Sequence, residues 1–435
     1  MGKTVNVGII GFGIVGSGTF KVLTKNRDEI KKKLDADLVV KKIADLDTES
    51  DRGISFDKSI LTKDAQQILE DPEIDIVVET IGGTNPAKKF ILQALENGKH
   101  VVTANKKLLA EEGQEIFKKA EEKNRLLLFE AAVGGAIPII RTAKTSLVSE
   151  HIKEVRGILN GTSNYILSKL SEGELSFEQA LKLAQEKGFA EADPSFDING
   201  TDAAHKIALL SRLIFGVDFD FKDIFIEGIE DLQAEDFLLA KKLGFEIKLL
   251  AISRMQKDKF FVCVHPTFLD VNSDLAQISG VKNAVTFFGD NFGELSFCGP
   301  GAGSLPTGTA ILADVISAAR HIALERGKCI PLMNFLPQHF KKVQPENILS
   351  RTGEYYIRFT FPDVAGVFAQ VSKVLASKDI SIASLIQTGD SQYGEIAKAA
   401  MILHDCSEKD LLDAKREIDK LPFMKEESFF MRIER

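Results

Sequence analysis

The chain has 435 residues, a length that predicts two or three domains because single hydrophobic cores rarely grow beyond about 250–300 residues. With 44% hydrophobic and 27% charged residues, its composition is that of an ordinary soluble globular protein. The formal net charge of −8 argues against nucleic acid as a partner, since phosphate binding needs a basic surface.

The cysteines and apolar runs indicate a cytoplasmic protein without a membrane partner. The four cysteines form no CxxC pair and read as reduced thiols: Cys263, Cys298, Cys329 and Cys406. The most apolar run, residues 126–140, is interrupted by a glutamate and is too short to span a bilayer. The first apolar run begins so close to Met1 that we expect no signal peptide.

A glycine-rich motif follows the first predicted strand, residues 5–10, and precedes a helix expected to run to about residue 34. GxGxxG spacing alone is weak, but between a strand and a helix it is typical of a dinucleotide-binding turn. The glycines let the backbone approach a pyrophosphate, and the helix N-terminus faces it. The candidate cofactor residues are Gly11, Phe12, Gly13, Ile14, Val15 and Gly16. A glycine-rich turn in another kind of α/β domain is the alternative.

Asp45 directly follows the second predicted strand, residues 38–44. A carboxylate there accepts the ribose hydroxyls of NAD and repels the phosphate of NADP. Three positive charges lie nearby in sequence, at Lys41, Lys42 and Arg52. The choice between NADP and NAD therefore stays open, with an inclination toward tolerance of NAD.

Strands and helices continue to alternate, which predicts a parallel sheet with crossover helices. Strands are expected at residues 74–80, 100–103 and 126–129, and helices at residues 86–97 and from 106 to about 123. Ligands of such sheets bind beyond the carboxyl ends of the strands, where Thr80 and Lys106 lie. We interpret residues 1–150 as a Rossmann NAD(P)-binding domain. A lysine is usually a solvated surface residue, which we expect of Lys107.

A loop at residues 130–138 carries one carboxylate, Glu130, among glycines and apolar residues. Together with backbone carbonyls this carboxylate could bind a hard cation, which prefers oxygen ligands. A glutamate that caps the following helix is an equally good interpretation.

The pattern changes near residue 152, where a strand leads to residues 160–163, which open a helix. A further helical run ends at Gly188 and is followed by an acidic loop up to Gly200. Thr201 is the expected N-cap of the next helix, and Asp202 and Lys206 share one face of it. An isolated Asp–Lys pair is usually a solvated ion pair, but an acidic loop before a helix is a typical polar site.

At these residues the chain resembles the homoserine dehydrogenases. The family signature is matched at its fixed spacings by Ala184, Gly188, Asp193, Pro194, Asp197, Gly200, Asp202 and Lys206. The resemblance implies NADP- or NAD-dependent interconversion of L-homoserine and L-aspartate 4-semialdehyde in threonine, methionine and isoleucine synthesis. No aspartate kinase region precedes the match, so we expect the monofunctional form.

The resemblance also implies residue roles. Lys206 is the expected proton donor and Lys106 the second cation at the reacting oxygen, because a lysine can both donate and stabilise developing charge. Substrate contacts are implied for Glu191, Asp202 and Asp197, with help from residues 162–164. Further cofactor contacts are implied at Asp45, Thr80, Lys106, Gly188 and Gly303. A monovalent cation, taken as sodium, is implied at Glu130, Val133, Gly135 and Ile137.

Beyond residue 245 the chain is rich in predicted strands, at residues 246–255, 259–264, 284–288 and 294–297. These fit an α+β substrate and dimerisation domain over residues 151–300, whose sheet could bury a homodimer or homotetramer interface. In the resembled family, the glycine-rich turn at residues 299–303 returns to the cofactor and the helix at 307–326 packs on the first domain. The nucleotide domain would then be completed by about residues 300–340.

A polar linker at residues 337–353 precedes a module with the order βαββαβ, which is ferredoxin-like. Residues 350–435 resemble an ACT domain, which implies an amino-acid effector, expected to be threonine, at Asp363 and Gly366. A purely structural dimerisation module is the alternative. Because the module follows the whole signature, we expect a chain ending near Gln344 to stay active and to lose its sensitivity to the effector.

Two other classes of function stay open. One is a Rossmann oxidoreductase that acts on a different amino acid or semialdehyde, and an assay of homoserine against other alcohols separates it. The other is a non-catalytic, amino-acid-sensing regulator, against which the intact acid–base residues argue.

Overall fold

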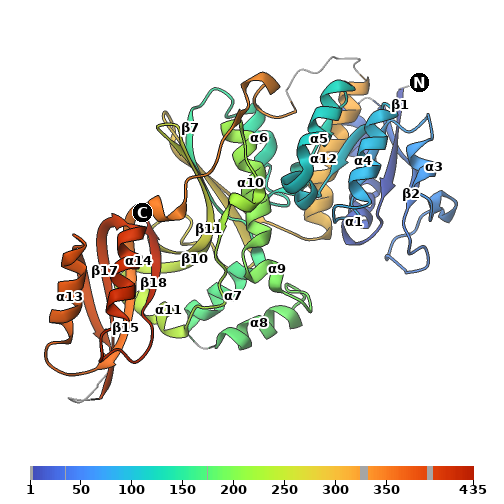
Figure 1. Cartoon of the computed structure of the whole chain (residues 1–435). Helices are drawn as coiled ribbons and strands as arrows, with labels where there is room; N and C mark the ends of the chain where they lie inside the picture. Colours follow the sequence, from blue (N-terminus) through green and yellow to red (C-terminus); the bar gives the residue numbers. More distant parts are fainter. Residues whose placement is uncertain (1–2, 35, 174, 324–331, 389–394) are drawn as a thin grey trace.

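The computed structural model describes residues 3–34, 36–173, 175–323, 332–388 and 395–435. Three parts follow one another across the molecule: an N-terminal α/β part, a central part with long strands, and a C-terminal part at the far end (Figure 1).

The N-terminal part is a six-stranded parallel sheet of order β3-β2-β1-β4-β5-β6, which confirms the predicted Rossmann-type α/β fold. Its strands are β1 Lys3–Ile10, β2 Ala36–Ala44, β3 Leu61–Thr62, β4 Ile76–Glu79, β5 His100–Thr103 and β6 Leu127–Leu128. Its helices are α1 Ile14–Lys25, α2 Arg27–Leu34, α3 Gln66–Leu69, α4 Ala87–Glu96 and α5 Lys106–Glu122.

The structure differs from the predicted elements of this part at two places. The single helix expected up to residue 34 is two helices, because Asn26 caps α1 and residues 25–29 lack the apolar side chains that would continue its buried stripe. The short elements β3 and α3 were not predicted, since two- and four-residue segments carry too little periodicity to be recognised.

A late helix, α12 Ser304–Ala323, packs on α1 and on the first sheet. The approach is close, because a Cβ at Gly308 would lie 2.7 Å from the backbone of Gly18. The structure thus confirms that this helix packs on the first domain, up to residue 323. Residues 324–326 of the predicted helix lie outside the described ranges. The residue limits of the domains stay an interpretation.

The central part contributes six strands to a second sheet: five in the order β13-β12-β7-β10-β11 with antiparallel neighbours, and the short β9, which pairs in parallel with β11. The bounds are β7 Ile152–Ile158, β10 Phe245–Gln256, β11 Lys259–Asp270, β12 Lys282–Gly289 and β13 Gly293–Pro300. The helices are α6 Ile139–Thr145, α7 Gly161–Glu172, α8 Phe177–Glu186, α9 Ser195–Ile198, α10 Thr201–Phe215 and α11 Ala234–Leu243. Short strands are β8 Val217–Asp218, β9 Phe225–Ile226 and β14 Lys341–Lys342. All the strands predicted beyond residue 245 are present, most of them longer than expected.

The C-terminal part has the predicted order βαββαβ. Its elements are β15 Thr352–Pro362, α13 Val367–Ser377, β16 Ile382–Thr388, β17 Ile396–Ser407, α14 Glu408–Ile418 and β18 Phe429–Glu434. The sequence did not predict how this module joins the rest of the chain: β18 pairs in parallel with β11 and makes one sheet of the central and C-terminal strands. A strand pattern shows where a strand lies and not which edge it joins.

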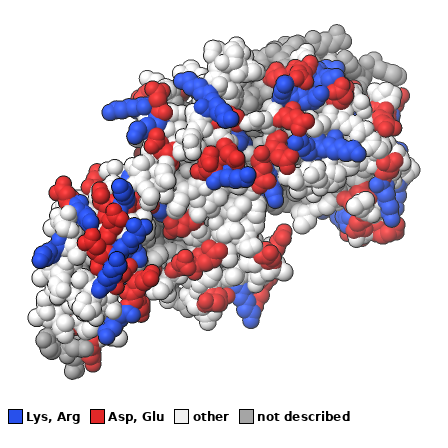
Figure 2. Space-filling model, viewed as in Figure 1, with Lys and Arg blue, Asp and Glu red and all other residues white. Residues whose placement is uncertain are grey.

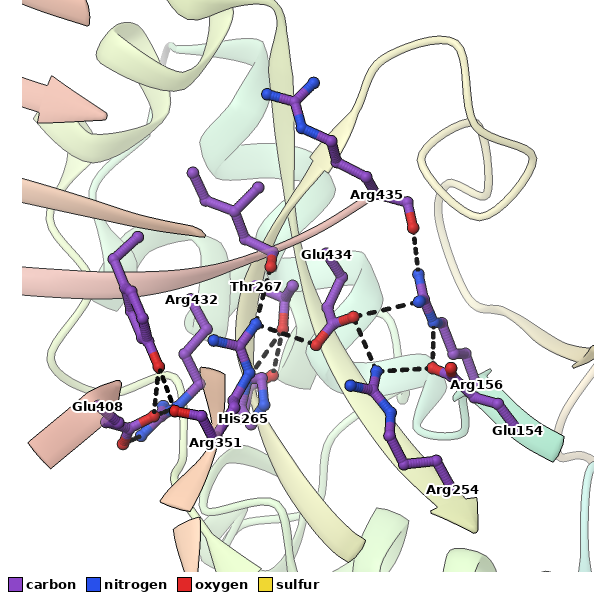
Figure 3. A network of polar contacts seen from close by, with 12 residues as sticks. Glu154, Arg156, Arg254, His265, Thr267, Arg351, Glu408, Arg432, Glu434 and Arg435 are labelled. Carbon is purple, nitrogen blue, oxygen red and sulfur yellow. Dashed lines mark hydrogen bonds and ion pairs between the residues drawn. The ribbon is translucent and has the colours of Figure 1, made fainter. Parts of the chain in front are cut away.

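Buried ion pairs cross this boundary (Figure 3). The Glu434 carboxylate on β18 lies 2.9 Å from Arg254 and 3.1 Å from Arg156 of the central strands. Burial acts to raise the pKa of Glu434, but the positive charges of the surrounding arginines outweigh this effect and lower the pKa to about 2. Arg432 donates 2.6 and 2.8 Å bonds to Glu408 of α14 and a 2.7 Å bond to Glu227 of the central part.

A second buried pair joins α11 to β15. Asp236 has no exposed surface and accepts 2.8 Å from Arg358 and 3.0 Å from the Tyr356 hydroxyl. Separating the two parts would leave buried charges without partners on both sides, which is strongly destabilising.

None of the helices in the described ranges is long and apolar enough to cross a bilayer. Basic and acidic side chains are intermixed over the face shown in Figure 2 and do not gather there into one basic surface. Cys263, Cys298 and Cys406 are free thiols, and Cys329 lies outside the described residues.

Candidate active site

Two helix N-termini meet beyond the carboxyl end of the first sheet. Helix α5 begins at Lys106 directly after β5, with Asn105 as its N-cap. Helix α10 begins at Thr201 and packs against α5. The predicted N-cap at Thr201 is wrong: Gly200 holds that position with φ +84°, a left-handed conformation that favours glycine, and Thr201 is already helical.

One carboxylate holds two lysines at this meeting point. Asp202 Oδ1 lies 2.9 Å from Lys106 Nζ, and Asp202 Oδ2 lies 2.5 Å from Lys206 Nζ. Asp202 is 4% exposed and Lys206 7%, so this is not the solvated ion pair of an ordinary helix surface. Lys206 Nζ also donates to the Leu159 carbonyl at 2.6 Å, which leaves one of its three N–H groups for a ligand.

The surroundings shift the pKa values of the two lysines in opposite directions. Burial lowers the pKa of Lys206, and Asp202 offsets this only in part because the charge on Lys106 acts in the same direction. Burial also acts to lower the pKa of Lys106, but Asp202, Asp197 and Glu191 outweigh it and the pKa is raised. Lys206 is therefore the lysine suited to exchange a proton, and Lys106 the one that keeps its charge.

The predicted acidic residues lie on the same side of the site. Asp197 Oδ1 accepts 2.7 Å from the side-chain amide of Asn160, which also donates 2.8 Å to Asp202 Oδ2. The pKa of Asp197 is raised. Burial is the main cause and the charge on Asp202 adds to it, whereas the hydrogen bond from Asn160 opposes the shift. Glu191 lies in the preceding loop, near enough to attract the charge on Lys106.

Residues 162–164 are engaged in holding neighbouring loops. The Thr162 hydroxyl donates to the Phe189 carbonyl, the Ser163 hydroxyl to the Asp197 carbonyl, and the Asn164 amide to carbonyls of residues 278–282. Their expected help with the substrate carboxylate would have to come from the backbone at this helix N-terminus, and it stays a prediction.

Sequence reasoning missed two partners of the acid–base residues. Asn160 was expected only to open a helix, and the Leu159 carbonyl was not singled out. The one signal was position: Leu159 and Asn160 are the first two residues after strand β7, and site residues gather at such strand ends.

The glycine-rich turn leaves room for a dinucleotide. Gly11 has φ +96°, and the Thr80 hydroxyl donates 2.8 Å to its carbonyl, so the predicted Thr80 lies against the turn. A Cβ at Gly16 would lie 2.0 Å from that same carbonyl, which requires glycine there. A Cβ at Gly13 would meet no atom within 4 Å, so this face is open to a ligand. Phe12 is different, because its ring is buried in the core and only its backbone borders the turn.

Asp45 and Arg52 lie on either side of this turn. The Asp45 carboxylate accepts from the Phe12 N–H and from the Asp47 N–H, and Arg52 Nε donates 3.0 Å to the Phe12 carbonyl. All three charges have partners: Lys41 pairs with Asp71 and Glu73, Lys42 with Gln67, and Arg52 with Asp47 at 3.0 Å. Of the three, Arg52 is the one that also contacts the turn.

The two remaining glycines of the predicted cofactor set lie in different places. Gly303 has φ +122° directly before α12, and the next side chain, Ser304, donates 2.8 Å to the Ile14 carbonyl of the glycine-rich turn. Gly188 has φ +72° at the end of α8, on the substrate side, and its contact with the cofactor stays a prediction.

We expect Gly13→Val to weaken dinucleotide binding by about tenfold or more while the fold is kept, because the new side chain fills the open space before the pyrophosphate. Calorimetric titration with NADP or NAD measures this. Val148→Ala, a change at an exposed valine away from the turn, is the control. Unchanged affinity in Gly13→Val would show that the cofactor lies elsewhere.

Glu130 caps a helix, which was one of its two interpretations. Its carboxylate accepts from the N–H groups of Ile140 and Arg141 in the first turn of α6, at 2.9 and 2.8 Å. Burial and the nearby Asp314 raise the pKa of Glu130 to about 7. The following loop turns through two left-handed glycines, Gly134 and Gly135. The Ile137 carbonyl already accepts from Ile139, so a cation would share that oxygen.

A parallel sheet with a glycine-rich turn, beside two lysines that share one buried carboxylate, is the arrangement of an NAD(P)-dependent oxidoreductase. The family models agree in detail. Residues 11–130 match the NAD-binding domain of homoserine dehydrogenase, residues 138–316 match homoserine dehydrogenase, and residues 355–423 match the ACT domain. The chain belongs to the homoserine dehydrogenase family.

Relatives match over nearly the whole length. The homoserine dehydrogenase of Neisseria gonorrhoeae is 40% identical, with 99% of each chain covered, and that of Bacillus subtilis is 35% identical, again with 99% of each covered. The crystal structure of a homoserine dehydrogenase from Thiobacillus denitrificans superposes with a TM-score of 0.93 at 37% identity, covering 99% of this chain and 98% of that one. A hyperthermophilic archaeal homoserine dehydrogenase in complex with NADPH covers 72% of this chain and 97% of its own, with a TM-score of 0.60 and 27% identity.

Proposed function

We propose that Lys206 exchanges the proton and Lys106 supplies the fixed positive charge when this homoserine dehydrogenase interconverts L-homoserine and L-aspartate 4-semialdehyde. The observation that carries this assignment is the pair of lysines on the two oxygens of one buried carboxylate, Asp202. A nicotinamide cofactor supplies the hydride acceptor or donor when bound.

The geometry gives each residue a step. When the alcohol is oxidised, its hydroxyl proton must leave as the hydride departs, and the amine of Lys206 takes it; burial lowers the pKa of Lys206, which makes its neutral form more accessible than that of an exposed lysine. In the reverse direction, the Lys206 ammonium returns the proton to the developing alkoxide. Lys106 keeps its charge beside Asp202 and stabilises the negative oxygen in both directions.

Glu191 and Asp197 are proposed to bind the polar groups of the substrate, together with Asp202. The substrate ammonium needs an anionic partner, and the loop that carries Glu191 and Asp197 presents carboxylates close to both lysines. Activity with L-homoserine and inactivity with other amino alcohols test the assignment. A chain that reduced NAD or NADP with other alcohols and not with L-homoserine would contradict it.

We propose that both cofactors are used. Asp45 is held by two backbone N–H groups and favours the ribose hydroxyls of NAD, whereas Arg52 lies beside the same turn and attracts the phosphate of NADP. Steady-state assays with NAD and NADP give the ratio.

Three further properties are proposals. They are a sodium ion bound by Glu130, Val133, Gly135 and Ile137, an assembly into homodimers or homotetramers, and a cytoplasmic location. A loop with two left-handed glycines after a buried carboxylate supports the ion. The edge strand β13, which has no partner beyond it among the described strands, supports an assembly through the second sheet. Three free cysteines support the location.

L-threonine is proposed to inhibit by binding near Asp363 and Gly366. Gly366 caps α13 in a left-handed conformation and Asp363 follows β15, so both lie at one strand–helix turn, where the Asp363 carboxylate accepts 3.0 Å from Gln387 of β16. We expect Asp363→Ala to raise the threonine concentration for half-inhibition about tenfold, equivalent to about 1.4 kcal/mol of coupling. Activity measured across threonine concentrations checks this, with Asp405→Ala, an exposed site on β17, as the control.

Equal threonine sensitivity of Asp363→Ala and the unaltered enzyme would place the effector elsewhere. An unaltered enzyme that ignores threonine would assign the ACT domain another ligand or a structural role.

A further inference from the structure

We propose that Asn160 is a positioning residue of the reaction: its side-chain amide ties Asp197 and Asp202 together and so orients Asp202 toward both lysines. The inference rests on the proposed roles of those residues. Asn160 directly follows β7 and Leu159, at the base of α7, and is 6% exposed.

Every polar atom of this amide has a partner. Asn160 Oδ1 accepts 2.8 Å from the Ser163 N–H and caps α7. The two N–H bonds of Nδ2 are divided between the acids, 2.7 Å to Asp197 Oδ1 and 2.8 Å to Asp202 Oδ2. The reverse orientation of the amide would point a carbonyl at two carboxylates, so the partners fix which end carries the nitrogen.

This arrangement places a donor between two acidic groups that would otherwise repel each other. Asp202 Oδ2, which receives the Asn160 hydrogen, is the same oxygen that faces Lys206. The residue before it, Leu159, accepts from Lys206 Nζ through its carbonyl. Two residues at the end of β7 therefore hold the reacting groups. The Asn160 side chain binds the Asp202 carboxylate, and the Leu159 carbonyl accepts from Lys206. Without the amide, Asp202 and Asp197 could turn apart, and a misplacement of about 1 Å can cost on the order of 100-fold in rate.

Asn160 also caps a helix, so the test must separate the two roles. Asn160→Asp keeps the size and remains a good N-cap, because aspartate accepts the Ser163 N–H as well as asparagine does. It replaces both donors to Asp197 and Asp202 by an acidic oxygen. The charged groups around it are Asp197 on α9, Asp202 and Lys206 on α10, Lys106 on α5 and Glu191 in the loop.

We expect Asn160→Asp to stay folded and to lower kcat by about 10- to 100-fold at pH 8, with a lower unfolding temperature at that pH because a third carboxylate now lies against Asp197 and Asp202. As the pH falls, protonation gives the new carboxyl one O–H donor, so the ratio of variant to unaltered kcat should recover at least about fivefold. Asn347→Asp introduces the same change at the remote cap of residues 348–350 and is expected to match the unaltered enzyme at every pH.

The measurement is kcat and KM for L-homoserine across pH, with thermal unfolding of each variant. Unaltered kcat in Asn160→Asp would overturn the proposal, and so would a constant loss without recovery at low pH. A loss that accompanies an unfolded variant would assign Asn160 only its capping role. If the unaltered enzyme did not turn over L-homoserine, the proposed function would fail instead, before the variants were compared.

Discussion

Replacing Lys206 by methionine is expected to lower kcat at least about 100-fold, the usual scale for removing a positioned acid–base group. Methionine has a similar length and no proton to exchange. The fold should persist, because the remaining groups keep partners: Asp202 retains Lys106 and Asn160, and the Leu159 carbonyl retains the Asn283 amide at 2.9 Å.

The measurement is steady-state kcat and KM with L-homoserine, accompanied by thermal unfolding. Lys107→Met is the matched control, since Lys107 is exposed one residue beyond Lys106 and should keep full activity. A folded Lys206→Met enzyme with near-normal kcat would remove Lys206 from the reaction and leave Lys106 as the candidate proton donor.

A chain that ends at Gln344 is expected not to fold into active enzyme. This reverses the expectation from the sequence, in which the C-terminal module could be removed without loss of catalysis. The cut exposes the edge of the 12-residue strand β11, where β18 pairs, and removes partners of the buried Asp236 and Arg156 and of the partly buried Arg254. Leaving one partner of a buried ion pair alone costs about 3–5 kcal/mol, a large share of the stability of a domain.

Solubility, circular dichroism and activity of the truncated chain test this. In the full chain, Asp236→Ala should lower stability by about 3–5 kcal/mol, whereas Glu354→Ala, at the exposed pair with Arg435, should change it by less than about 1 kcal/mol. A soluble, active truncated enzyme would show that the shared sheet contributes little.

The sequence predicted those parts of the fold and site that depend on neighbours in the chain. The glycine-rich turn and the Asp202–Lys206 pair each lie within one local motif, so their place between neighbouring elements could be predicted from nearby residues, although the N-cap of α10 is Gly200 and not Thr201. Lys106 is different: it stands 96 positions before Asp202, and only the family resemblance placed it in the site. The geometry now brings the two to 2.9 Å.

Two features had no local signature. The hydrogen bonds of Asn160 run to residues 37 and 42 positions away, so nothing in the Asn-Gly-Thr-Ser run indicates them. The pairing of β18 with β11 depends on which strand edges the tertiary fold leaves open, and alternation of apolar residues does not encode that. The role of Glu130 was only partly predictable. The sequence allowed a carboxylate before a helix either to cap that helix or to bind a cation, and the structure shows the cap.

The most direct test of the acid–base assignment is a crystal structure of the enzyme with L-homoserine and oxidised cofactor. The assignment predicts the substrate hydroxyl oxygen within about 3.2 Å of Lys206 Nζ, with Lys106 Nζ beside the same oxygen and both lysines still on Asp202. A hydroxyl group bound away from the Nζ atoms of both lysines, with Lys206 engaged only by Asp202 and Leu159, would contradict it.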